Sequence, residues 1–205
     1  RLTMTILQAN KFYFQKGGAE RYMLELSGWL EAQGHTVAPF AMRHPDNLET
    51  PYADDFVSFV QTESSRTSPW QSARTLCRML YSLEARRKLA TLIAREKPDL
   101  AHIHNIYTQI SPSILHTLKD QRVPVVMTVH DHHLISPQYN VWATGCGEDV
   151  RRVGLLRGTL SRYHKDSYAA SFAQTLAYKL HRAMRIWERH VDLFICPSQY
   201  MKRQL

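Results

Sequence analysis

A pair of glycines between an apolar segment and a helical one constrains the fold of this chain more than any other feature. Residues 3–9 are apolar and rich in residues that favour β-structure, which predicts a short buried strand. Gly17 and Gly18 follow, and apolar residues then recur at helical spacing up to Gly34, which we expect just past the end of a helix. The chain is therefore predicted to open with a strand, a glycine turn and a helix.

This turn has the chemistry of an anion site. Gly17 and Gly18 carry no side chains, so backbone amides can approach a ligand closely, and the first turn of the helix adds partial positive charge. A phosphate or diphosphate suits this geometry, with Lys16 and Arg21 as secondary candidates beside it. The tight turn that any strand–helix unit needs explains the same glycines equally well, and neither a GxGxxG pattern nor a Gly-Lys-Ser/Thr phosphate loop occurs there.

Strand-like segments alternate with helical ones along the rest of the chain. This alternation predicts an α/β fold with a doubly wound, mostly parallel sheet and helices on both faces. The length and an apolar content of 44% suit one large domain over residues 1–205. The predicted strands are residues 3–9, 36–42, 56–60, 100–104, 123–130 and 191–196.

Helices are predicted between these strands. Residues 68–71 have the pattern of a capping box with proline at the first helical position, and the apolar periodicity after them predicts one long helix to about Lys97. Further along the chain we expect a helix that opens at Ser111 and a long loop over one end of the sheet at residues 131–158. One or two helices are expected over residues 160–189, and Ser198 is expected to cap a last helix.

The apolar segments and the cysteines indicate the compartment. The longest apolar run, residues 123–129, is far too short to span a bilayer, and the N-terminus lacks an apolar signal stretch. Cys77, Cys146 and Cys196 have no regular spacing and are expected to stay reduced. We therefore expect a soluble, cytoplasmic protein.

The formal net charge of +8 indicates a polyanionic partner. Basic residues gather in residues 74–97 and 151–189 and are interleaved with aromatic ones, a pattern that suits an anionic membrane surface or a phosphorylated substrate. Solvated helix faces explain the same charges. No recognised nucleic-acid-binding motif accompanies them, so nucleic acid is not an expected partner.

One histidine-bearing segment follows the predicted strand at residues 100–104. Strand alternation places His102 and His104 on the same face of this strand. Together with nearby histidine and aspartate residues they could bind zinc, as in metal-dependent hydrolases, although carboxylates are scarce in these segments. A buried structural role is the simpler interpretation of His102, and His104 is a secondary site candidate.

A second segment, at the end of the predicted strand 123–130, carries the main catalytic candidate. His130 is expected to face the crevice where ligands bind in open parallel sheets, as a donor near a substrate hydroxyl or leaving group. Asp131 or Asn105 would orient the ligand or the loop. If these strands are neighbours of the first one, both segments share one site with the Gly17–Gly18 turn.

Four motifs stand in order along nearly the whole chain. They are the strand with its Gly-Gly-Ala-Glu-Arg turn in residues 3–21, and residues 97–105, 123–131 and 192–198. In this order and spacing they resemble the N-terminal domain of family 4 glycosyltransferases of the GT-B fold, the glycogen synthase-like and mannosyltransferase-like enzymes. The resemblance implies a Rossmann-like domain.

The resemblance also implies an activity. It is the retaining transfer of a hexose from a nucleotide-sugar donor to an acceptor hydroxyl, without metal or cofactor, in a cleft between two Rossmann-like domains. His130 would contact the transferring sugar and assist the reaction centre. Gly17 and Gly18 would approach the donor diphosphate and the acceptor, while Glu20, Asn105 and Asp131 would shape the acceptor side.

The expected acceptor is a polysaccharide, a lipopolysaccharide or a lipid-linked glycan, with the basic helices at the inner face of the plasma membrane. The donor-binding domain of such enzymes is not in this sequence, so these 205 residues alone are expected to be inactive. A non-catalytic module that binds a phosphorylated sugar or a partner is the alternative. A zinc hydrolase is the third hypothesis.

Overall fold

A computed structural model describes residues 3–60, 69–137 and 154–205, and their contacts gather in two compact units. The first, called the sheet unit below, contains Arg1–Thr128 and Trp187–Ile195. The second, the helical unit, contains Val129–Ile186 and Cys196–Leu205. One functional domain over residues 1–205 stays a prediction.

The sheet unit contains five parallel strands. They are paired in the order β2-β1-β3-β4-β5, so β1 lies between β2 and β3. Leu7, Ala101 and Met127 on three neighbouring strands are fully buried, as expected for a sheet covered on both faces. The predicted α/β class and the doubly wound topology are confirmed. The strands are β1 (Thr5–Ala9), β2 (Thr36–Phe40), β3 (Leu100–Ile103), β4 (Val125–Thr128) and β5 (Leu193–Ile195).

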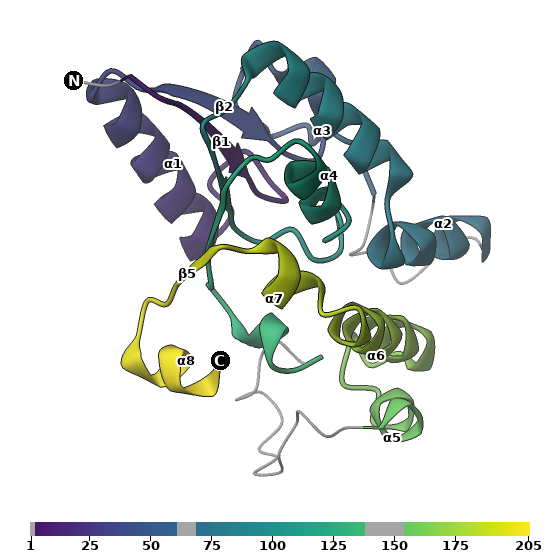
Figure 1. Cartoon of the computed structure of the whole chain (residues 1–205). Helices are drawn as coiled ribbons and strands as arrows, with labels where there is room; N and C mark the ends of the chain where they lie inside the picture. Colours follow the sequence, from purple (N-terminus) through teal and green to yellow (C-terminus); the bar gives the residue numbers. More distant parts are fainter. Residues whose placement is uncertain (1–2, 61–68, 138–153) are drawn as a thin grey trace. The chain divides into compact units, whose positions relative to one another are not determined.

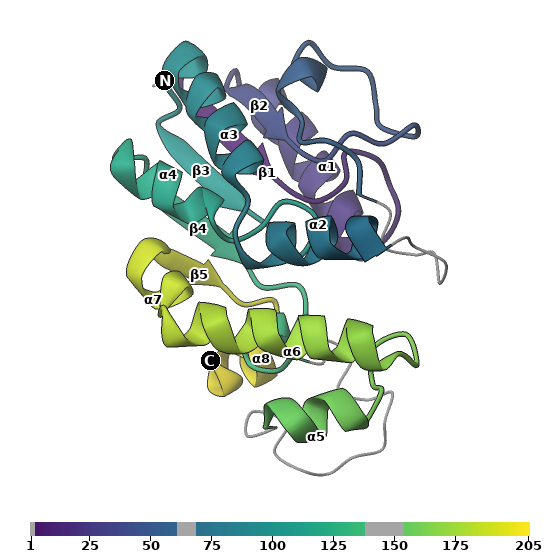
Figure 2. The same cartoon turned by 90° about the vertical axis from the view of Figure 1, so that its right-hand side faces the viewer.

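Helices cover both faces of this sheet. Helix α1 (Gly18–Ala32) lies on one face, and α3 (Leu83–Glu96) and α4 (Ile114–Asp120) lie on the other (Figures 1 and 2). Gly34 follows α1 with a φ of +91°, the left-handed conformation expected just past a helix end. The short helix η1 (Ala53–Asp55) precedes α2 (Pro69–Leu80), and α7 (Ile186–His190) leads into β5.

The predicted strand at residues 56–60 is wrong. Only Val57 pairs, in an isolated bridge with Met42. The backbone of Ser58 is engaged elsewhere, because its N–H donates to Oε1 of Glu84 at 2.7 Å and its carbonyl accepts from Arg78. These side-chain contacts replace the ladder hydrogen bonds that a strand would need.

The single long helix predicted up to Lys97 is also wrong. It is divided into α2 and α3 at Ser82, which has extended backbone angles and accepts the Ala85 N–H at 3.1 Å as the N-cap of α3. The Ser82 N–H donates in turn to Oγ of Ser113. The capping box at residues 68–71 depends on residues outside the described part. The helix expected to open at Ser111 is α4, which begins at Ile114, because Ser111 has a φ of +93°.

The helical unit contains η2 (His132–Leu134), α5 (Leu155–Leu160), α6 (Tyr168–Ala183) and α8 (Gln199–Gln204). Ser198 caps α8 as predicted, since its hydroxyl accepts the Met201 N–H at 3.1 Å. The long loop predicted at residues 131–158 contains η2 and the start of α5. Its middle, with Cys146, lies outside the described residues.

Candidate functional site

The candidate site lies where the strand order of the sheet reverses. From β1 the chain continues through α1 to β2 on one side, whereas from β3 it continues through α4 to β4 on the other. Ligands of open α/β sheets bind in the crevice at the carboxyl ends of such neighbouring strands. Here the segments that follow β1 and β3 lie at that edge of the sheet. The first strand pairs with β3, the first histidine-bearing strand, whereas β4, which precedes His130, pairs with β3 and β5 and not with β1.

Asn10, directly after β1, joins these two segments. Its side chain is fully buried and its Oδ1 accepts the N–H of Asn105 at 3.1 Å. Its Nδ2 donates to the carbonyl of Phe12 at 2.9 Å and to Oε1 of Glu20 at 3.2 Å. The Lys11 N–H donates to the carbonyl of Asn105 at 2.8 Å, so backbone contacts reinforce the side-chain bridge.

The glycine turn reaches the solvent at the N-terminus of α1. Gly17 and Gly18 are both exposed, and neither has the left-handed backbone that would require glycine. A Cβ at Gly18 would meet no atom within 4 Å, whereas a Cβ at Gly17 would lie 3.3 Å from Oε2 of Glu20. Gly18 is therefore open to a ligand, and the Glu20 carboxylate lies against Gly17.

The flanking cations have local partners. Arg21 pairs with Glu25 at 2.7 Å on the exposed side of α1. The ammonium group of Lys16 lies 4.5 Å from the centre of the Phe12 ring. Lys16 and Arg21 flank the turn in the sequence, and both are exposed.

His102 on β3 and His104 directly after it are both buried. The rings of His102 and His104 are 4.3 Å apart, which confirms that the two residues share one face. His104 is fully buried with Nε2 2.7 Å from Oε1 of Gln8, and His102 Nε2 lies 2.7 Å from Oγ1 of Thr128. Through these contacts, both histidines support the packing of the neighbouring strands.

Two buried polar atoms of this site have no hydrogen-bond partner. Among the residues that the structure describes, these are Nε2 of Gln8 and Oδ1 of Asn105, whose side chains are 1% and 7% exposed. A buried polar atom without a partner is costly, and a ligand is one way to satisfy it. Asn105 is therefore suited to a ligand that donates a hydrogen bond.

His130 and Asp131 belong to the helical unit. β4 ends at Thr128, so His130 lies two residues beyond the strand and does not end it as predicted. His130 and Asp131 are both half-buried. Asp131 caps η2, with Oδ1 accepting the N–H of His133 at 2.9 Å. A common site of these two residues with the glycine turn stays a prediction.

Helix α6 holds the segment that carries His130. Gln174 lies with Nε2 3.1 Å from Nε2 of His133, and one turn later Tyr178 donates its hydroxyl to the carbonyl of Ile135 at 2.8 Å. The segment after β4 is thus supported by side chains of one helix face.

Elsewhere in this unit, burial lowers the pKa of His164 to about 4, and the neighbouring Lys165 adds to the shift.

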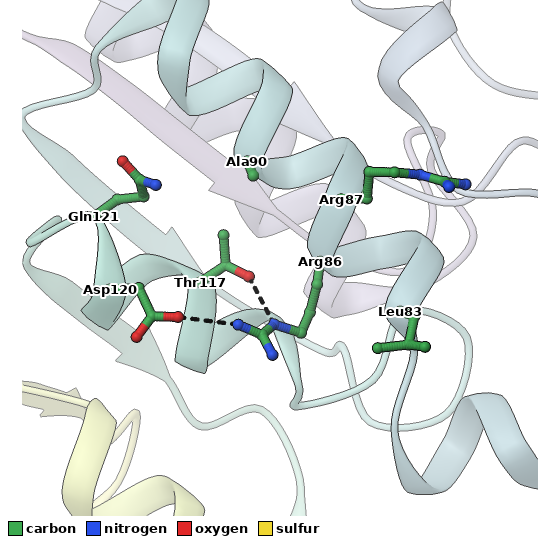
Figure 3. A pocket seen from close by; sticks show the side chains of 7 residues that line it. All are labelled: Leu83, Arg86, Arg87, Ala90, Thr117, Asp120 and Gln121. Carbon is green, nitrogen blue, oxygen red and sulfur yellow. Dashed lines mark hydrogen bonds and ion pairs between the residues drawn. The ribbon is translucent and has the colours of Figure 1, made fainter.

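An open hollow of about 290 Å³ lies between α3 and α4 (Figure 3). At its centre Arg86 donates to Oγ1 of Thr117 at 3.2 Å and pairs with Asp120 at 2.9 Å. None of the predicted site residues lines it. The hollow is therefore separate from the candidate site.

The helical unit presents apolar side chains to solvent beside its cations. Leu156 and Leu160 on α5 are 73% and 61% exposed, and Arg157 between them is exposed as well. Arg182 at the end of α6 and Arg185 are also exposed. Such a mixture suits an anionic, partly apolar surface. No helix in the described ranges is long and apolar enough to cross a bilayer.

The predicted zinc cluster does not form within the described part of the chain. There, no group of three or more histidine, cysteine, aspartate or glutamate side chains gathers in a way that could hold a metal ion. His102 and His104 are adjacent, but each ring nitrogen described above lies against an oxygen of a neighbouring side chain.

Sequence reasoning missed Asn10 and Gln8. Both lie on or directly after β1, at the carboxyl edge where ligands are expected. Asn10 was recognisable only as the boundary of the first strand. Asn10 could have been found by the same rule as Asn105, because a polar residue directly after a buried parallel strand lies at the edge where ligands bind.

A doubly wound α/β unit with polar residues at its switch point is thus the structural class of this protein. The comparison with protein families matches Glycosyltransferase Family 4 over residues 16–205, which is nearly the whole chain. The chain belongs to this family and is a glycosyltransferase domain, as its motif order predicted.

Among solved structures, the chain is similar to MurG of Acinetobacter baumannii. The sequence identity is 14% and the TM-score 0.37, and the match covers 62% of this chain and 36% of the MurG chain. The chain thus spans about a third of the length of that protein. The comparison with curated proteins finds no match. The assignment to the family depends on the family match alone.

Proposed function

We propose that this chain is the acceptor-side, N-terminal half of a retaining GT-B glycosyltransferase. The enzyme moves a hexose from a nucleotide-sugar donor to a hydroxyl of a polysaccharide, a lipopolysaccharide or a lipid-linked glycan, without a metal ion or cofactor. The observation that supports the proposal most is the family match over residues 16–205, whose first residues contain the glycine turn at the switch point.

The two sides of the turn suggest different ligand groups. Gly18 is open, and the N-terminus of the 15-residue helix α1 supplies amides and partial positive charge, which suits the donor diphosphate. Glu20 carries a carboxylate, which accepts hydrogen bonds from hydroxyl groups and repels phosphate. We therefore assign Glu20 and Asn105 to the acceptor hydroxyls and Gly18 to the diphosphate, with Gly17 between them.

His130 is the proposed catalytic residue. Its imidazole is half-buried and would contact the transferring sugar, with Asp131 shaping the acceptor side through the η2 cap. Positioned acid–base or polar groups of this kind typically contribute 10²- to 10⁴-fold to a rate. His130→Ala in the complete enzyme is therefore expected to lower kcat at least about 100-fold with little change in Tm.

His133→Ala is the matched control for this experiment. It removes an imidazole from the same segment, one that lies against Gln174. We expect it to lower Tm and to leave most of the turnover. Wild-type turnover in His130→Ala, or equal losses of turnover in both variants, would contradict the role of His130.

Membrane contact through the helical unit is the second part of the proposal. The exposed leucines and cations of α5 and α6 support peripheral binding to an anionic surface at the inner face of the plasma membrane. The acceptor would then be reached at that surface. Vesicle binding by charge-reversal variants tests this part independently of turnover.

A further inference from the structure

The Asn10 side chain makes three hydrogen bonds. One is local, to Phe12 two residues along the same loop, and the other two reach Glu20 in the first turn of α1 and Asn105 after β3. The side chain is 0% exposed, so no water competes for these contacts. One residue thereby ties together both segments that flank the switch point.

We propose that Asn10 is a positioning residue of the transfer site: it holds the Glu20 carboxylate on the glycine turn and the Asn105 segment on the opposite side in one fixed arrangement. The inference rests on the proposed function, because only there do these two segments bind parts of the same reacting pair.

The polarity of an amide makes asparagine specific for this role. The amide NH₂ donates to the Glu20 carboxylate and to the Phe12 carbonyl, while the amide oxygen accepts the Asn105 N–H. An ionised aspartate could keep only the bond to Asn105, and it would place a second carboxylate about 3 Å from the first. A leucine of similar volume could keep none.

The positions of the two bridged residues give the bridge its functional consequence. Oε2 of Glu20 lies 3.3 Å from the place that a Gly17 Cβ would occupy, so the carboxylate that Asn10 holds lies at the turn itself. On the other side, the buried Oδ1 of Asn105 has no partner among the described residues. Releasing Asn10 would therefore move the buried Glu20 carboxylate and the Asn105 amide, the two groups assigned above to the acceptor, relative to each other.

The first test needs no substrate. Amide hydrogen exchange of the complete enzyme is measured by mass spectrometry for wild type, Asn10→Ala and the control Asn47→Ala. Asn47 is a matched residue because it also bridges backbone groups, accepting the Tyr13 N–H at 3.1 Å and donating to the Met42 carbonyl at 2.8 Å. Asn10→Ala should speed exchange at least threefold both in residues 16–21 and in residues 104–107, and Asn47→Ala in neither. Faster exchange in only one of these segments would overturn the bridge.

The second test separates positioning from mere stability. In Asn10→Asp, the new carboxylate and Glu20 are expected to share one proton at acidic pH and to repel each other above it. The ratio of variant to wild-type kcat/KM should therefore rise at least tenfold from pH 8 to pH 5.5. Asn10→Asp with Glu20→Gln restores a donor opposite the carboxylate, so its ratio should lose this pH dependence. Asn47→Asp should show none.

The two tests keep the inference distinct from the proposed function. Turnover is measured with a panel of uridine- and guanosine-diphosphate sugars and a membrane extract of the source cells as acceptor. A wild-type enzyme that transfers no sugar would contradict the proposed function, while the exchange experiment would still decide whether Asn10 joins the two segments. A pH-independent activity ratio in Asn10→Asp, with an active wild type, would overturn the positioning role alone.

Discussion

Gly18→Ala is expected to make the enzyme more stable and less active at the same time. A Cβ at Gly18 would meet no atom within 4 Å, and the backbone there is not left-handed, so the protein itself accommodates alanine without strain. Any loss of activity would then come from the ligand that approaches the turn.

Both effects can be estimated. Alanine in place of a glycine with compatible backbone angles stabilises by about 0.4–1 kcal/mol, which raises Tm by about 1–4 °C for a chain of this length. A methyl group between the first-turn amides and the diphosphate would remove about one charge-assisted hydrogen bond. Such a bond contributes about 1.5–3 kcal/mol, or about 10- to 150-fold in kcat/KM.

Gly28→Ala provides the control for this prediction. Gly28 lies in the same helix, is exposed, and a Cβ there would also meet nothing within 4 Å. Thermal unfolding and donor-dependent turnover are measured for both variants. We expect a higher Tm in both and lower turnover only in Gly18→Ala. Equal, wild-type turnover in the two variants would refute the assignment of the turn to a ligand.

Two further predictions concern the helical unit. Arg182→Glu combined with Arg185→Glu should weaken binding to anionic phosphatidylserine vesicles at least tenfold in low salt, because basic residues near such a surface contribute about 1 kcal/mol each. Charge reversal at the exposed Arg87 of α3 is the control and should have little effect. Unchanged vesicle binding by the double variant would refute the proposed membrane surface. The pKa of His164 is lowered to about 4, so the neutral imidazole is favoured in the folded state, and its contribution to stability is present above about pH 6.5 and lost as the pH falls toward 4. His164→Gln should therefore flatten the pH dependence of unfolding between pH 7 and pH 4 by about 2 kcal/mol after allowance for partial exposure, and parallel curves for the variant and wild type would contradict this.

Periodicity predicted those parts of the fold that local sequence determines. The strand β1, the turn and α1 follow from an apolar run, two glycines and a helical stripe that lie within 34 residues. Ser198 as the cap of α8 is equally local. The doubly wound class followed from the alternation of strands and helices, and the pairing of β1 with β3 agrees with the general rule for such sheets.

Contacts between distant segments decided the rest. Ser58 leaves the sheet because Arg78 and Glu84 bind its backbone, and Ser82 ends one helix and begins another while it contacts Ser113. Apolar periodicity contains no information about such polar partners. In each case a side chain 20 or more residues away satisfies a backbone group that regular structure would otherwise satisfy.

The candidate site likewise contains parts that local sequence predicts and parts that depend on contacts between distant segments. The turn and the polar residue after β3 were predictable, because glycines before a helix and polar groups after a strand are local patterns. The bridge through Asn10 was not, since it requires Glu20 and Asn105 to approach one side chain from different elements. The burial of His104 against Gln8 likewise depends on the pairing of β1 with β3.

The transfer reaction itself tests the central claim most directly. The complete enzyme is incubated with a panel of nucleotide sugars and the membrane extract of the source cells, and the anomeric configuration of the product is determined by NMR. The proposed function predicts a glycosylated acceptor with the anomeric configuration of the donor, and loss of this product in His130→Ala. An inverted product, or no transfer from any nucleotide sugar, would contradict it.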